Sequence, residues 1–201
     1  MLKIYYADIS SVDINKLYPL SDYCCGRLKS TSNQTKRREG IGAELLLNYA
    51  LKDICPALKL PPDIDTLEHG KPVLRGGDVQ FSLSHSAGMA AVALCDSPVG
   101  VDIQVKTRYN AALAKRFFCE DERLYIERCD DKDTAFTEIW CAKESYIKAL
   151  GTGLNTALGS FSVIDMPCVR AFDIGAYMLA VCASGYEKIE PDLIEKIELP
   201  L

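Results

Sequence analysis

The 201-residue sequence contains no run of apolar residues long enough to span a bilayer, and its N-terminus, M-L-K-I-Y-Y-A-D, lacks the basic-then-apolar layout of a signal peptide. We therefore expect a cytoplasmic protein with no membrane partner. No G-x-x-x-x-G-K-[ST] loop is present, so this motif of generic nucleotide-binding phosphotransferases is missing. Positive charge is scarce, because 23 Lys and Arg residues are set against 28 Asp and Glu residues. The net charge of −5 argues against general nucleic-acid binding, which requires a broad positive field.

The nine cysteines are odd in number and form no C-x-x-C pair. Several lie in apolar runs, such as A-A-V-A-L-C at residues 90–95. Buried reduced thiols are therefore expected rather than disulfides or a zinc site. With 48% hydrophobic residues, the chain can build a core, either as one domain or as two small ones.

The stretch W-C-A-K-E-S-Y-I-K-A-L-G, residues 140–151, predicts a helix that ends at its final glycine. Helical spacing puts five residues on or beside one stripe: Trp140, Lys143, Glu144, Ile147 and Lys148. An ordinary amphipathic helix keeps its charges on the solvent face, so this mixed stripe indicates a helix whose inner edge lines a charged cleft. A Glu and a Lys four residues apart are also typical of a surface ion pair, and the helix alone does not decide between the two.

The segment V-G-V-D-I-Q, residues 99–104, predicts a strand in which Val101 and Ile103 face one way and Asp102 and Gln104 the other. An aspartate inside an otherwise apolar strand is costly unless it is paired or bound to a metal. Asp102 is therefore the strongest single candidate for a functional residue.

Two short strands, residues 79–84 and 89–95, are expected around a turn at residues 85–88. His85 stands between two serines at the end of the first strand. A histidine in this setting can bond a phosphate or shuttle a proton, and it can equally cap the turn. Lys71 lies between a glycine and a proline, on backbone with restricted freedom.

A helical pattern runs from residue 22 to residue 49, with Arg37 and Arg38 at the head of its apolar part. The partial positive charge of a helix start would add to theirs and favour an anion there, although a solvated basic patch explains the same residues. A second helical segment, 109–128, should break near 120–122, and Asp133 or Thr134 should cap the helix that contains Trp140.

A pattern that occurs twice in the sequence predicts the domain organisation. F-S-L at residue 81 and F-S-V at residue 161 each follow a helix, and each precedes an apolar strand that ends in cysteine. Strands are expected at 2–7 and in a later set made of F-S-V-I-D (161–165), R-A-F-D-I (170–174) and A-Y-M-L-A-V-C-A-S (176–184). We predict an α+β fold of two pseudo-symmetric helix-plus-antiparallel-sheet lobes, residues 1–99 and 100–201, with the active site in the cleft between them.

Five motifs occur together in a fixed order: G-K-P (70–72), S-L-S-H-S (82–86), G-V-D-I (100–103), R-F-F-x-x-x-E (116–122) and W-C-A-K-E-S-Y-I-K-A-L-G (140–151). In this order and spacing the chain closely resembles the 4′-phosphopantetheinyl transferases. The resemblance runs from about residue 37 to residue 182. It is to the larger, surfactin-synthetase-activating type, whose single chain contains two lobes, rather than to the smaller trimeric type.

The resemblance implies an activity, its cofactor and its partners. Such enzymes transfer the phosphopantetheine arm of coenzyme A to a serine of an apo acyl or peptidyl carrier protein, require Mg²⁺, and release adenosine 3′,5′-bisphosphate. Asp102 and Glu144 would bind the metal, and Lys148 would face the reacting phosphate. Glu144, directly or through water, leads the candidates to take the serine proton. The phosphates and adenosine of coenzyme A would be held by Arg38, Lys71, Ser84 and His85.

One residue departs from the family pattern, because many relatives have a third metal-binding glutamate where this chain has Gln104. An amide carries no charge, so the resemblance predicts weaker metal binding or a water in its place. The same departure supports an alternative, a carrier-binding relative with weakened catalysis.

The resemblance also implies the partner and the oligomeric state. The carrier should be an acidic helical protein from fatty acid, polyketide or nonribosomal peptide synthesis, and the enzyme should be a monomer. Candidate docking residues are Lys115, Arg116, Phe117 and Phe118, although the two phenylalanines are better explained as core residues.

Overall fold

The computed structural model describes residues 1–153 and 156–199. Its helices are α1 (Asp22–Lys29), α2 (Gln34–Ile54), α3 (Ala111–Phe117), α4 (Glu120–Arg128) and α5 (Lys132–Leu150). Its strands are β1 (Leu2–Asp8), β2 (Ile64–Thr66), β3 (Pro72–Leu74), β4 (Gln80–Ser86), β5 (Met89–Cys95), β6 (Val99–Val105), β7 (Val169–Ile174), β8 (Tyr177–Ala183) and β9 (Ile194–Lys196). The α+β class expected from the sequence is confirmed.

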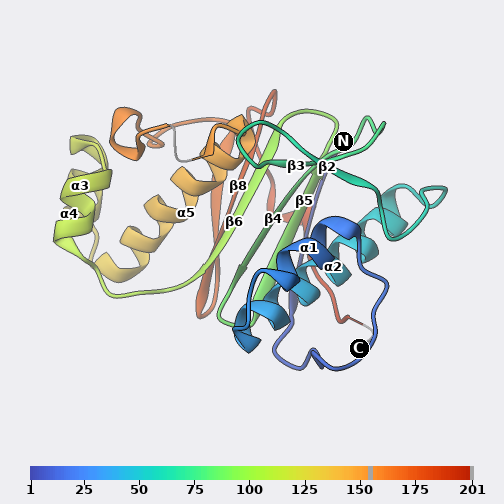
Figure 1. The fold of residues 1–201 in the computed structure, drawn as a ribbon. Coiled ribbons are helices and arrows are strands. Elements are labelled where there is room, and N and C mark those ends of the chain that lie inside the picture. Colours follow the sequence, from blue (N-terminus) through green and yellow to red (C-terminus); the bar gives the residue numbers. More distant parts are fainter. Residues whose placement is uncertain (154–155, 200–201) are drawn as a thin grey trace.

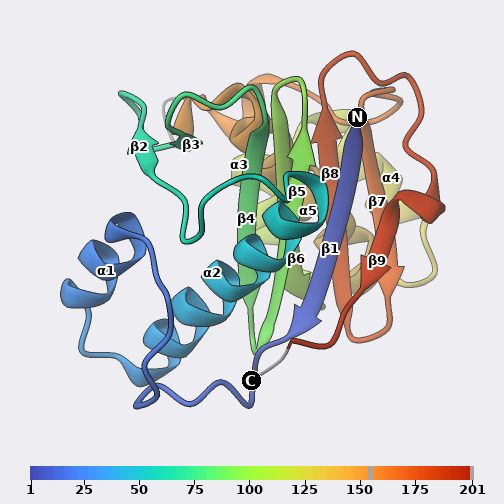
Figure 2. The same ribbon diagram turned by 90° about the vertical axis from the view of Figure 1, so that its right-hand side faces the viewer.

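The molecule has four layers in the order α2, first sheet, second sheet and α5. One sheet has the order β4-β5-β1-β9 and the other the order β6-β8-β7, with a small β2-β3 ribbon beside them. The long helices lie on opposite sides of the strands, with α5 on one side and α2 on the other (Figure 1). Seen from the side, α2 crosses the sheet that contains β4, β5 and β1 (Figure 2). Each half of the chain thus contributes one long helix packed on antiparallel strands.

The period of two in the strands explains these layers. On β5, Val92 and Leu94 pack toward α2, whereas Ala91 and Ala93 pack toward the other sheet. The sheet-to-sheet core includes Val101 and other fully buried residues of β6 and β8. A third cluster joins α5 to the far side of β8. Because both faces of each sheet are covered, β5 is apolar along its whole length.

Serine side chains join the two sheets along the edge where β4 meets β6. The hydroxyls of Ser82 and Ser86 accept hydrogen bonds from the backbone N–H groups of Val101 and Val105, at 3.0 and 3.3 Å. Between them, Ser84 donates to Asp102 at 2.7 Å. The alternating serines of S-L-S-H-S therefore fix the register of β4 against β6, and they set Asp102 at the junction of the two sheets.

Several local predictions are confirmed and several are wrong. The opening strand is present, the predicted break between helices falls at residues 118–119, and Gly151 ends α5 with a left-handed φ of 70°. The expected strand at 161–165 is wrong, since this segment is irregular, and Asp131 caps α5 in place of the two expected residues. The pattern from residue 22 contains two helices, because a second cap, Asn33, starts α2.

The last described segment returns to the first half of the chain. Strand β9 pairs in parallel with β1, and Ile197 is buried in the core beside α2. The division into lobes at residues 99 and 100 stays a prediction. The packing of β9 and Ile197 on the first half shows that the end of the second half crosses this boundary. All nine cysteines are free thiols, and four of them are buried. No helix within the described ranges has both the length and the apolar composition needed to cross a membrane.

Candidate active site

A cavity of about 860 Å³ opens along the edge where β4 meets β6, between the helices of the two halves. Six of the predicted site residues line it: Ser84, His85, Asp102, Gln104, Glu144 and Lys148. They come from β4, β6 and α5, so three segments far apart in the sequence converge here. This convergence makes the cavity the candidate active site.

Asp102 lies at the centre of the polar contacts. Its side chain is almost completely buried, with 2% of the residue exposed. Oδ1 accepts hydrogen bonds from the Ser84 hydroxyl and from Nζ of Lys148, both at 2.7 Å. Lys148 also donates to the carbonyl of Val101 at 3.0 Å. The sequence-based expectation that this carboxylate needs a partner is thus met by an ammonium group and a hydroxyl.

Helix α5 can pack closely against β6 because Gly100 of that strand has no side chain. A Cβ built on Gly100 would lie 1.9 Å from the carbonyl oxygen of Ser145 and 2.5 Å from the amide nitrogen of Ala149. Both are backbone atoms of α5 and cannot move aside singly. The glycine therefore allows the close packing that brings Glu144 and Lys148 up to Asp102, one turn apart on the same helical face.

Glu144 has a perturbed ionisation. Burial raises the pKa of its carboxyl above the usual value, the negative charge of Asp102 raises it further, and Lys148 opposes both effects. The two carboxyl groups are therefore close enough to repel one another. A pair of acids held together in a cavity is typical of a cation site.

The raised pKa of Glu144 makes stability depend on pH. Between the ordinary pKa of 4.5 and the raised value, the folded protein holds a proton that the unfolded chain has lost, so the free energy of unfolding falls as pH rises. We expect Glu144→Gln to raise the melting temperature near neutral pH and to have little effect below pH 4.5. Thermal unfolding across this pH range, with the exposed Glu120→Gln as control, measures the difference. An equal gain at every pH would contradict this electrostatic origin.

The oxygens in the cavity fit a hard cation. Asp102 and Glu144 supply carboxylates, and the amide of Gln104 lies beside them, with Nε2 3.4 Å from Oδ2 of Asp102. Among residues 1–153 and 156–199, no group of three or more His, Cys, Asp or Glu side chains could hold a metal ion. Two carboxylates without a third acid suit Mg²⁺, which usually binds one or two carboxylates together with substrate phosphate and water.

Two of the predicted coenzyme A residues lie outside this cavity. Lys71 lines an adjoining cavity of about 300 Å³ that also touches Glu144 and Lys148. Its Nζ donates to the carbonyls of Val99 and Ala149, and burial lowers its pKa. Arg38 donates to the carbonyl of Val12 at 3.2 Å and is not among the described residues that line either cavity. The structure thus brings Lys71 beside the site but ties Arg38 to a backbone group.

The predicted position of His85 in a turn is wrong. His85 lies within β4, opposite Ala90, and the turn consists of Ala87 and Gly88, both with positive φ. The strand places its imidazole on the side that faces α2, where Nδ1 lies 3.3 Å from Oε2 of Glu39. His85 therefore faces an acid rather than capping a turn.

One face of α2 lines the cavity and was not predicted from the sequence. Lys36 and Glu39 stand three residues apart and share this face, whereas Arg37 donates to the carbonyl of Leu28 at 2.9 Å. Arg27 of α1 also lines both cavities. The helical period counted from Lys36 would have identified these residues, because the next cavity residues of α2 follow at positions 40, 43 and 44.

Lys143 does not belong to the charged cleft, so its place on the predicted stripe is wrong. Its side chain is completely buried, and Nζ lies 2.7 Å from both carboxylate oxygens of Glu122. The carbonyl of Phe161 accepts a third hydrogen bond from Nζ at 2.5 Å. This ion pair fastens α4 and the 161–163 segment to α5, so both residues have a structural role.

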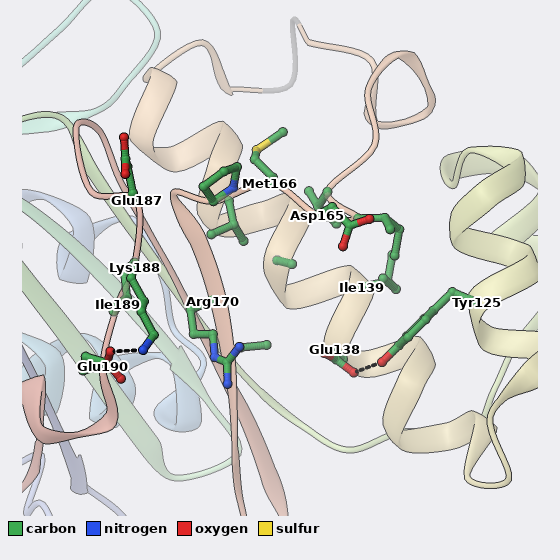
Figure 3. A pocket seen from close by; sticks show the side chains of 16 residues that line it. Tyr125, Glu138, Ile139, Asp165, Met166, Arg170, Glu187, Lys188, Ile189 and Glu190 are labelled. Carbon is green, nitrogen blue, oxygen red and sulfur yellow. Dashed lines mark hydrogen bonds and ion pairs between the residues drawn. The ribbon is translucent and has the colours of Figure 1, made fainter.

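A separate cavity of about 620 Å³ lies on the other side of α5 (Figure 3). The α5 residues that line it, Glu138 and Ile139 among them, point away from the face that contains Glu144. Glu138 accepts a hydrogen bond from Tyr125 at 2.8 Å, and Lys188 pairs with Glu190. The described lining residues include none of the predicted site residues. The cavity of Asp102 and Glu144 therefore stays the candidate active site.

Comparison with known proteins identifies the family of this chain. Residues 98–174, which include β6 and α5, match the family model of the 4′-phosphopantetheinyl transferase superfamily. A protein named psf-1 from Bacillus pumilus, described as a 4′-phosphopantetheinyl transferase, is 31% identical over 183 residues, covering 81% of this chain and 76% of the relative. The chain therefore belongs to the 4′-phosphopantetheinyl transferase superfamily.

Two relatives from Bacillus subtilis show which type within the superfamily the chain is similar to. A 4′-phosphopantetheinyl transferase is 34% identical over 151 residues, 66% of this chain and 65% of the relative. The 4′-phosphopantetheinyl transferase Sfp of strain 168 is 33% identical over 153 residues, 67% of this chain and 66% of that protein. The chain thus spans about two thirds of the length of these relatives, and its similarity is to the larger, Sfp type.

Proposed function

We propose that this chain transfers the 4′-phosphopantetheine arm of coenzyme A to a serine hydroxyl of an apo carrier protein. The observation that carries the proposal is the meeting of Asp102 from β6 with Glu144 and Lys148 from α5 in one cavity. Members of this superfamily generally use Mg²⁺ and coenzyme A. Both halves of one chain supply the site, which supports a monomer as the working unit. Nine free thiols favour the cytoplasm as its compartment.

The reaction breaks the phosphoanhydride bond of coenzyme A and forms a phosphate ester bond to the serine. The serine oxygen attacks the phosphorus that bears pantetheine, the bond from that phosphorus to the bridging oxygen breaks, and adenosine 3′,5′-bisphosphate leaves. The serine proton must be accepted by a base, and the leaving phosphate must be stabilised. Phosphoryl transfer needs positioning and neutralisation of charge more than covalent chemistry by the protein.

The described side chains match these tasks. Asp102 and Glu144 would hold Mg²⁺, which when bound supplies positive charge to the pyrophosphate. Glu144, directly or through a water, is the leading candidate to accept the serine proton. Lys148 lies 2.7 Å from Asp102 and would exchange part of that contact for the transferred phosphate. Ser84 keeps the Asp102 carboxylate oriented.

The carrier protein would approach past α3. Lys115 and Arg116 are exposed there, and Arg116 stacks over the ring of Phe117 at 4.9 Å. Phe118 is buried with 3% exposure, so it belongs to the core rather than to a docking surface. An acidic helical carrier would meet these cations on α3, whose Phe117 packs against Trp140 of the cavity wall.

Gln104 gives the proposal a quantitative test. Its Oε1 accepts a hydrogen bond from Ser86 at 3.2 Å, and its Nε2 faces Asp102, so the residue adds no charge to the cation site. We expect Gln104→Glu to lower the Mg²⁺ concentration for half-maximal rate by about tenfold, because a third carboxylate strengthens the site. Initial rates measured against Mg²⁺ concentration give this value. An unchanged Mg²⁺ requirement would show that residue 104 does not touch the metal.

The activity itself is tested by mass spectrometry of apo carrier proteins incubated with this chain, coenzyme A and Mg²⁺. The expected product carries one added phosphopantetheine arm on its serine, with equimolar adenosine 3′,5′-bisphosphate. Binding of coenzyme A and carrier without any added mass would instead favour the alternative of a catalytically weakened relative, for which Gln104 is the supporting feature.

A further inference from the structure

The side chain of Lys71 leaves the small β2-β3 ribbon and ends between β6 and α5. The residue directly precedes β3. Its carbonyl accepts a hydrogen bond from the N–H of Leu67 at 2.9 Å, and Gly70 before it has a φ of 85°. A tight turn therefore fixes the point from which this side chain starts.

The ammonium group of Lys71 joins two elements. Nζ donates to the carbonyl of Ala149 at 2.9 Å and to the carbonyl of Val99 at 3.2 Å. Ala149 lies in the last turn of α5, where carbonyls have no partner within the helix and where the helix dipole favours a cation. Val99 begins β6, an edge strand whose outward carbonyls also need partners. One ammonium group thus satisfies a carbonyl of each element.

This bridge lies where α5 and β6 come closest. Gly100 follows Val99, and a Cβ built on it would lie 2.5 Å from the amide nitrogen of Ala149. Lys148 makes a second bridge two residues further along β6, because its Nζ donates to the carbonyl of Val101 at 3.0 Å. The carbonyls of residues 99 and 101 point toward the same edge of the strand. The two ammonium groups therefore hold the last turn of α5 against the open edge of β6.

The aliphatic part of the Lys71 side chain is also packed in place. A Cβ built on Gly151 would lie 3.0 Å from Cδ of Lys71, so this side chain passes directly over the glycine that ends α5. Burial lowers the pKa of Lys71, because it makes the charged form more costly than at the surface. The two carbonyls offset part of this cost, and they use two of the three N–H donors of the ammonium group.

We propose that Lys71 is a positioning residue for the transfer reaction. Its ammonium group fixes the last turn of α5 on β6 and so holds Glu144 and Lys148 in place, rather than binding a phosphate of coenzyme A. Both residues lie within five positions of Ala149, so a displacement of this turn would move them away from Asp102. The inference rests on the proposed function, because it concerns the placement of the residues that would carry out the transfer.

The variant Lys71→Met keeps the aliphatic part of the side chain and removes the ammonium group. We expect kcat at saturating coenzyme A and Mg²⁺ to fall by about ten- to a hundredfold, because the reacting groups are misplaced. The dissociation constant of coenzyme A, from isothermal titration calorimetry without carrier protein, should stay within about threefold. The matched control is Lys52→Met in the last turn of α2, an exposed lysine for which both values should be unchanged.

Two further variants separate positioning from other roles. In a Glu144→Gln background, adding Lys71→Met should lower kcat only slightly further, because Lys71 acts through the helix that contains residue 144. Lys71→Gln keeps N–H donors for the two carbonyls without the charge, so it should lose less of kcat than Lys71→Met. If Lys71→Met does not fold, Lys71→Gln is measured instead, with the same threefold limit on the dissociation constant. Circular dichroism at the assay temperature verifies the fold.

Three results would overturn the proposal. A dissociation constant of coenzyme A raised about tenfold or more in Lys71→Met would show that the ammonium group binds the substrate. A lower melting temperature with unchanged kcat would show that Lys71 only stabilises the fold. In both cases the proposed transfer function stands. Failure of the unmodified chain to modify any apo carrier protein would remove the proposed function and this inference with it.

Discussion

Replacing Asp102 with asparagine is expected to lower the rate of phosphopantetheine transfer by about 10²- to 10³-fold. The amide keeps the size of the side chain and can still accept from Ser84, so the fold should survive. It removes the charge that holds the cation and pairs with Lys148 at 2.7 Å. Initial rates of product formation at saturating coenzyme A and Mg²⁺ measure the loss.

The matched control is Asp192→Asn, an exposed aspartate remote from the cavity, for which the rate should be unchanged. A double variant gives a second check. If Asp102 and Glu144 share one ion, replacing both with alanine should cost little more than replacing Asp102 alone, because residues that act as a unit are not additive. Asp102→Asn activity above about a tenth of the original rate would be incompatible with a central role for this carboxylate.

Lys143→Met is expected to lower the free energy of unfolding by about 3–5 kcal/mol, which is a large part of the stability of a small protein. The substitution leaves Glu122 as a completely buried carboxylate without its ammonium partner. The remaining donors to Glu122 are the backbone N–H groups of Cys119 and Val163, which do not neutralise its charge. Equilibrium unfolding in urea at neutral pH measures the loss.

The double variant Glu122→Gln/Lys143→Met separates charge from packing. Replacing both partners with neutral groups removes the uncompensated charge, so it should recover more than half of the stability lost in Lys143→Met. A double variant as unstable as the single one would show that shape, rather than charge, makes this pair necessary.

The parts of the site that follow from local patterns could be predicted. The period of two placed Asp102 on the face of β6 that meets a helix, and the helical period placed Glu144 and Lys148 one turn apart. Gly151 marked the end of α5 through a backbone conformation that glycine adopts most readily. Each of these signals lies within one element, where the spacing of residue types determines direction.

The parts that depend on contacts between elements could not be predicted. The periodic pattern put Lys143 on the same stripe as Glu144. The partner of Lys143 is Glu122 of α4, and the sequence of α5 alone does not show that α4 supplies this carboxylate. The close approach at Gly100 depends on the position of α5, which no spacing reveals. Arg38 looked like an anion ligand beside a helix start, but the carbonyl of Val12, distant in sequence, takes its hydrogen bond.

The pair of His85 and Glu39 shows how both kinds of information combine. The sequence indicated that His85 is suited to bind a phosphate, and the family resemblance implies that it helps to hold coenzyme A. The structure adds a carboxylate beside it, because Nδ1 of His85 lies 3.3 Å from Oε2 of Glu39 on α2. This neighbour comes from another element, so the spacing of residues around His85 in the sequence could not indicate it.

The most direct test of the account is a crystal structure of this chain with coenzyme A and Mn²⁺ in place of Mg²⁺, in which anomalous scattering locates the ion. We expect one peak, with a carboxylate oxygen of Asp102 and one of Glu144 each about 2.1 Å away and the pyrophosphate completing the shell. An ion bound to only one of these residues, or a pyrophosphate located away from both, would contradict the claim that they form a single cation site.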